Sequence, residues 1–177
     1  MDNYWSKIIG ELNQVDVTVD DKFVDFIHDA NRIFVIGAGR SGLAIKAFAM
    51  RLSQLGKQAF VVGETTNPPI TEGDVIVVAS GSGTTAQAVM LAQKAQTVGA
   101  KVGLITTSRD TPLTEIAEQV VFLGGKAKYE ENSTTVQPMG SLFEQSVFLY
   151  GDAFVLGYME KFSITESEMQ QRHANLE

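Results

Sequence analysis

The feature that most constrains the fold of this chain is a series of short apolar, β-branched runs. The clearest run, Val75–Ala79 (VIVVA), has no polar residue at any position, which is typical of a strand covered on both faces in a parallel sheet. Four further strands are predicted over residues 32–37, 59–63, 102–106 and 119–123. Helical patterns lie between most of these five predicted strands. The alternation predicts an α/β three-layer sandwich, with helices on both faces of a five-stranded parallel sheet of flavodoxin-like order.

The rest of the chain is predicted to be mainly helical. Amphipathic patterns predict helices over residues 1–12 and again after Thr18, and a last helix over 164–172. A longer helix is predicted over 140–162, and its apolar residues occupy more than one stripe, so a partner subunit is a plausible cover. The length of 177 residues suits a single domain, 1–177, with N-terminal helices and a C-terminal helix and tail.

Composition excludes several classes of function. The chain has no cysteine, which removes disulfides, thiolate catalysis and cysteine-based zinc sites. A formal net charge of −7 and the lack of Lys and Arg clusters argue against nucleic acid as a partner. No apolar run approaches the roughly 20 residues of a membrane helix, and the N-terminus does not have the pattern of a secretory signal. These features fit a cytoplasmic protein that does not bind a membrane.

A loop of glycine and hydroxyl residues follows the VIVVA strand and precedes a helix predicted over 84–98. Its sequence is Ser80-Gly81-Ser82-Gly83-Thr84-Thr85. Backbone N–H groups at a helix N-terminus favour an anion, hydroxyls add neutral donors, and glycines allow close approach. No lysine follows in the Walker position, which disfavours a nucleoside triphosphate. A single phosphate monoester suits this loop; the alternative is a turn whose Ser and Thr merely cap the helix.

A second glycine loop follows the first strand. Residues 37–42, GAGRSG, satisfy the pattern GxGxxG, and Glu64 follows about 20 residues later, so dinucleotide binding is an alternative hypothesis. Arg40 and Ser41 within this loop are suited to donating hydrogen bonds. Ligands of doubly wound sheets bind beyond the carboxyl ends of the strands, where the winding reverses. We therefore expect the two glycine loops to flank one site, with the polar segment 124–139 as a mobile loop near the ligand.

Two titratable side chains are candidates for acid–base chemistry. Glu144 lies one turn into the otherwise apolar helix predicted over 140–162, where a carboxylate needs a partner or a function. Partial removal from water makes a carboxylate more basic, which suits a general base; the alternative is a first-turn glutamate that complements the helix dipole. His173 can exchange a proton near neutral pH, or it can be an ordinary residue of a disordered tail.

Four segments together resemble the sugar isomerase (SIS) family of phosphosugar-binding domains, and within it the 6-phospho-3-hexuloisomerases. They are GAGRSG, SGSGTT, QPMGSLFEQ (residues 137–145) and the terminal RHANLE. The resemblance implies that Ser80, Ser82 and Thr85 bind a substrate phosphate, that Gly81 and Gly83 allow its approach, and that Ser41 is a further hydroxyl ligand. It also implies Glu144 as the enolisation base and His173 as a histidine contributed by a neighbouring subunit.

The activity implied by the resemblance is the interconversion of D-arabino-hex-3-ulose 6-phosphate and D-fructose 6-phosphate. The two ketones occupy adjacent carbons, so a 2,3-enediolate connects them, and the reaction belongs to formaldehyde fixation in the ribulose monophosphate pathway. The resemblance implies a homotetramer or dimer that needs neither metal nor cofactor. Three alternatives stay open: a non-catalytic phosphosugar sensor, an isomerase of another phosphosugar or of carbons 1 and 2, and a dinucleotide-binding protein.

Overall fold

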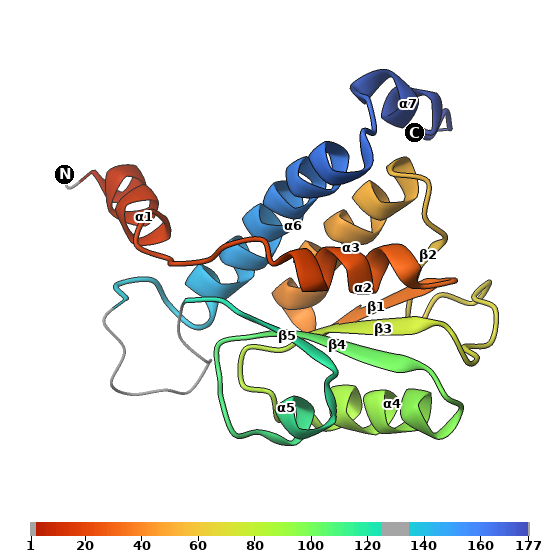
Figure 1. Cartoon of the computed structure of the whole chain (residues 1–177). Helices are drawn as coiled ribbons and strands as arrows, with labels where there is room; N and C mark the ends of the chain where they lie inside the picture. Colours follow the sequence, from red (N-terminus) through yellow and green to blue (C-terminus); the bar gives the residue numbers. More distant parts are fainter. Residues whose placement is uncertain (1–2, 125–134, 177) are drawn as a thin grey trace.

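A computed structural model describes residues 3–124 and 135–176. Its centre is a five-stranded, all-parallel sheet in the order β2-β1-β3-β4-β5 (Figure 1). The strands are β1 (Ile33–Gly37), β2 (Ala59–Val61), β3 (Val75–Ala79), β4 (Lys101–Thr106) and β5 (Gln119–Phe122). The predicted flavodoxin-like order is confirmed. All five residues of the central strand β3 are buried, as expected of a strand covered on both faces.

Helices cover both faces of this sheet, which gives the predicted three layers (Figure 1). One face carries α2 (Asp21–Asp29), α3 (Gly39–Gln54) and α6 (Ser141–Phe162) around the larger core, in which Phe23, Phe48 and Phe154 pack edge to face. The other face carries α4 (Ala86–Thr97) and α5 (Pro112–Ile116) around a core of mostly aliphatic side chains. The remaining helices are α1 (Tyr4–Leu12), beside the start of α6, and α7 (Glu166–Gln171), beyond its end.

Several boundaries differ from those predicted, and capping accounts for two of them. The first helix begins at Tyr4 because the Asn3 side chain accepts from the Ser6 amide, and the last begins at Glu166 because Thr165 and Glu168 form a capping box. Helix α3 already begins at Gly39, so the loop is shorter than the GAGRSG motif of residues 37–42. A Cβ on Gly42 would lie 2.6 Å from the Gly37 oxygen, so helix and strand require glycine at this contact.

Part of the long helix α6 is uncovered, although its pattern predicted burial from several sides. Phe148, Leu149 and Leu156 are exposed, as are Leu43 and Met50 on the neighbouring helix α3. Contiguous exposed apolar side chains mark a surface that another molecule can cover. Most of the predicted loop 124–139 lies outside the described residues. No helix of the described chain is both long and apolar enough to cross a membrane.

Candidate active site

The two glycine loops meet where the winding of the sheet reverses. Strands β1 and β3 are neighbours, and Gly37 at the end of β1 pairs with Ala79 at the end of β3. The loops that follow therefore leave adjacent strands at the same level, at the carboxyl edge of the sheet. The expectation that both loops flank one region is borne out by this register.

The loop of residues 80–85 is held in a definite shape by its own hydrogen bonds. The Gly83 amide donates to the Ser80 oxygen over 3.2 Å, which closes a tight turn. Gly83 has a φ of +64° and is packed against the side chain of Thr111, so glycine is required there for both its backbone conformation and its size. The Ser80 and Thr85 hydroxyl oxygens lie 3.1 Å apart, and the Ser82 hydroxyl accepts from the Thr84 hydroxyl over 3.1 Å. Of the hydroxyls expected to bind a phosphate, those of Ser80 and Thr85 thus lie beside each other on a preformed turn that also carries Ser82.

Three helices begin around this loop without a side-chain cap. Within the described residues, no side chain accepts from the first turn of α3, α4 or α6. The other four helices, α1, α2, α5 and α7, all have a capping side chain. Uncapped N–H groups and the positive ends of the helix dipoles favour a bound anion. The uncapped helix ends are therefore the three that surround the glycine loops.

Helix α6 reaches this region through Phe143 and Glu144. A Cβ on Gly81 would lie 3.2 Å from the Phe143 ring, so the first turn of α6 packs directly on the loop of residues 80–85. Glu144 is the next residue, and its side chain is only 7% exposed. The structure thus brings a buried carboxylate to the edge of the predicted phosphate loop.

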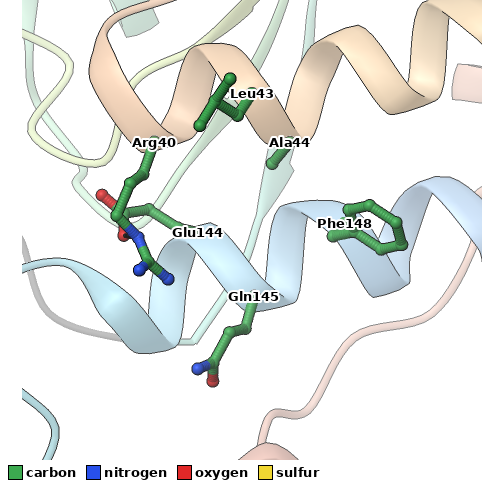
Figure 2. Close-up of a pocket in the computed structure, with 6 residues that line it drawn as sticks. All are labelled: Arg40, Leu43, Ala44, Glu144, Gln145 and Phe148. Atoms are coloured by element: carbon green, nitrogen blue, oxygen red, sulfur yellow. Dashed lines mark hydrogen bonds and ion pairs between the residues drawn. The ribbon is translucent and has the colours of Figure 1, made fainter.

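Arg40 is the partner of this carboxylate. The Arg40 Nε donates to the Glu144 Oε2 over 2.6 Å, and the arginine side chain is 62% exposed (Figure 2). No other donor in the described part of the chain meets the carboxylate. A cavity of about 300 Å³ adjoins this pair, lined by Arg40, Leu43, Ala44, Glu144, Gln145 and Phe148. The sequence indicated that Arg40 is suited to donating hydrogen bonds, and in the structure it donates one to Glu144.

His173 does not reach the site within one subunit. It lies after α7, where the neighbouring Arg172 donates to the backbone oxygen of Gln54 at the C-terminal end of α3. Arg40 is in the first turn of the same helix. A helix of 16 residues is about 24 Å long, so His173 and Glu144 are at opposite ends of it. Ser41, unlike His173, lies at the end of α3 near Glu144, because it directly follows Arg40 in the first turn of that helix.

The sequence-based prediction missed the contribution of the loop after β4. Thr106, Thr107 and Ser108 all donate from their hydroxyls to the Gly81 oxygen. The signal was present as a run of hydroxyl residues at the carboxyl end of a strand next to β3. The described residues contain no group of three or more His, Cys, Asp or Glu side chains suited to a metal ion.

Fold and site together define a doubly wound α/β protein with a loop rich in glycine and hydroxyl residues and a buried carboxylate at the switch point. The SIS domain family matches residues 26–147, and the chain belongs to this family. It is 38% identical to the 3-hexulose-6-phosphate isomerase of Bacillus subtilis over 98% of this chain and 97% of that protein. It is also 42% identical to an uncharacterised protein of Archaeoglobus fulgidus, over 93% of this chain and 91% of the relative.

A solved structure supports the same assignment. The chain superposes on a protein of Methanococcus jannaschii with a TM-score of 0.79 and 31% identity, covering 100% of this chain and 90% of the other. The crystal structure of that protein was taken to infer a molecular function of 3-hexulose-6-phosphate isomerase.

Proposed function

We propose that this protein is a 6-phospho-3-hexuloisomerase, which interconverts D-arabino-hex-3-ulose 6-phosphate and D-fructose 6-phosphate. The observation that carries the proposal is the position of Glu144, a buried carboxylate beside the preformed loop of residues 80–85, whose Oε1 meets no donor among residues 3–124 and 135–176. The 38% identity to the Bacillus subtilis enzyme over nearly the whole chain supports the same substrate class.

In this proposal the phosphate end of the sugar binds first and orients the rest. Ser80, Ser82 and Thr85 donate from their hydroxyls, and the uncapped N-terminus of α4 supplies backbone N–H groups. Gly81 and Gly83 allow the phosphate to approach the backbone. Ser41 in the first turn of α3 is a further donor. Binding energy from the phosphate then holds the reacting carbons beside Glu144.

The chemical step is a proton transfer between adjacent carbons. Glu144 removes the proton from C2 of the 3-ulose; the electron pair of that bond forms the C2–C3 double bond, and the C3 carbonyl electrons move to O3. The product is a 2,3-enediolate, and the hydroxyl proton of O2 passes to O3. Return of the proton from Glu144 to C3 leaves the carbonyl at C2, which is fructose 6-phosphate. Arg40, paired with Glu144, keeps the carboxylate oriented and adds positive charge near the developing oxyanion.

His173 enters this scheme from a second copy of the chain, where it would assist ring opening or relay the proton between O2 and O3. The exposed apolar side chains of α3 and α6 support such an assembly, because Leu43 and Phe148 both belong to this surface and line the cavity beside Glu144. A neighbouring subunit on this surface would therefore border the site. We propose a homo-oligomer, a tetramer, acting in the cytoplasm without metal or cofactor.

The test follows fructose 6-phosphate in D₂O by NMR. New 3-ulose signals with deuterium at C3 of the recovered fructose 6-phosphate are the expected result. Exchange at C1 alone would assign the protein to aldose–ketose isomerases, and phosphosugar binding with neither product nor exchange would leave a sensor. Glu144→Gln is expected to lower kcat about 10³-fold with phosphate binding intact. Glu160→Gln, an exposed position on the same helix, is the matched control and should be unchanged.

A further inference from the structure

One backbone carbonyl at the site receives an unusual number of hydrogen bonds. The Gly81 oxygen accepts from the hydroxyls of Thr106 (3.1 Å), Thr107 (2.9 Å) and Ser108 (2.9 Å), and from the Thr107 amide (3.3 Å). The Thr106 hydroxyl in turn accepts from the Ser108 amide over 3.2 Å. All four donors come from the end of β4 and the loop after it.

These donors determine the orientation of the peptide unit between Gly81 and Ser82. In a trans peptide the C=O and N–H groups point in opposite directions. The carbonyl points to the β4 loop, so the N–H of Ser82 points away from that loop. On the other side of β3 from β4 lies β1, which is followed by Arg40 and Ser41 in the first turn of α3.

The same donors also strengthen this N–H as a hydrogen-bond donor. Hydrogen bonds accepted by a carbonyl polarise its peptide unit and leave more positive charge on the amide hydrogen. Within the part of the chain that the structure describes, the Ser82 N–H has no acceptor. An oriented, polarised and unpaired N–H at the edge of the candidate site is suited to binding an oxyanion.

We propose that Thr107 and Ser108 are positioning residues: they orient the Gly81–Ser82 peptide so that the Ser82 N–H donates to the substrate's phosphate. The residues act through the peptide and do not touch the ligand. This inference rests on the proposed function, because it takes the anion bound by the Ser82 N–H to be the phosphate group of the sugar substrate.

The test uses inorganic phosphate as the probe and the Ser82 amide as the reporter. In the ¹⁵N-labelled wild-type protein, saturating phosphate should move the Ser82 amide proton downfield. The double variant Thr107→Val, Ser108→Ala should bind phosphate about tenfold more weakly, with a correspondingly raised KM for the phosphosugar and kcat within about twofold. Thr107→Ser, which keeps the hydroxyl, should behave as the wild type. Thr97→Val removes a comparable hydroxyl-to-carbonyl bond at the far end of α4 and is the matched control.

The outcomes separate this inference from the proposed function. A Ser82 amide that does not respond to bound phosphate overturns the inference even if the protein isomerises its sugar, and this measurement needs no variant to fold. Unchanged phosphate affinity in a folded double variant also overturns it. Phosphate binding through Ser82 without isomerase turnover would support the inference and reject the proposed function.

Discussion

Asp74 is a carboxylate with side-chain exposure of only 1%, and its replacement by asparagine tests how the start of the sheet is held together. It accepts from Arg32 Nε (3.0 Å) and Nη2 (2.7 Å), and from the amide (2.7 Å) and hydroxyl (3.1 Å) of Thr71. Arg32 immediately precedes β1 and Asp74 immediately precedes β3. The ion pair therefore joins the central strand β3 to its neighbour β1 at the edge of the sheet opposite the site.

Asp74→Asn should lower the free energy of unfolding by about 2 kcal/mol, because it removes the counter-charge of Arg32 and turns a buried NH₂ group toward the donors of Arg32 and Thr71. Asp152→Asn is the matched control. Its carboxylate lies 3.7 Å from Arg51, and the two side chains are 48% and 43% exposed. Exposed pairs of this kind contribute little, so the control should cost less than about 0.5 kcal/mol.

The pH dependence gives an independent check. Burial raises the pKa of Asp74, but hydrogen bonds from Arg32 and Thr71 outweigh it, and the pKa lies below its ordinary value. The unfolded state therefore binds the proton more tightly, so this stabilisation is complete above about pH 5 and is lost as the pH falls through the native pKa. Urea unfolding of wild type and Asp74→Asn should show a constant difference from pH 8 to 5 and a shrinking one below about pH 4. Equal costs for Asp74→Asn and Asp152→Asn at pH 7 would refute the reasoning.

Two further predictions concern the loop and the exposed surface. Gly83→Ala should lower the free energy of unfolding by about 2 kcal/mol, because the positive φ disfavours a side chain and the new Cβ would displace the capping side chain of Thr111. Gly10→Ala in α1 is the control in the same urea titration and should be neutral or slightly stabilising, since the new Cβ meets nothing within 4 Å. Similar decreases in the free energy of unfolding for Gly83→Ala and Gly10→Ala would contradict this explanation. Leu156→Glu, at a side chain 69% exposed on α6, should convert the proposed oligomer to monomers in sedimentation velocity with unchanged circular dichroism. An intact oligomer would place the interface elsewhere.

Much of the fold could be predicted from local pattern. The apolar runs identified all five strands, because a strand buried on both faces must be apolar at successive positions. The two glycine loops were predicted to lie together at the carboxyl edge of the sheet, and the register of β1 and β3 confirms that they leave adjacent strands there. Helix ends were less predictable, since Asn3 and Thr165 act through side-chain contacts that a periodic pattern does not contain.

Residue type and local pattern indicated which side chains could carry chemistry, and the packing of helices and strands brought some of them together. Glu144 stood out as a carboxylate in an apolar helix, but its partner Arg40 is 104 residues away and no spacing connects them. The donors to the Gly81 carbonyl lie 25 to 27 residues beyond it, at the end of the neighbouring strand β4 and in the loop after it. His173 and Glu144, both plausible from residue type, are separated by the length of α3. Chemical identity is a local property of the chain, whereas distance and orientation follow from how strands and helices pack.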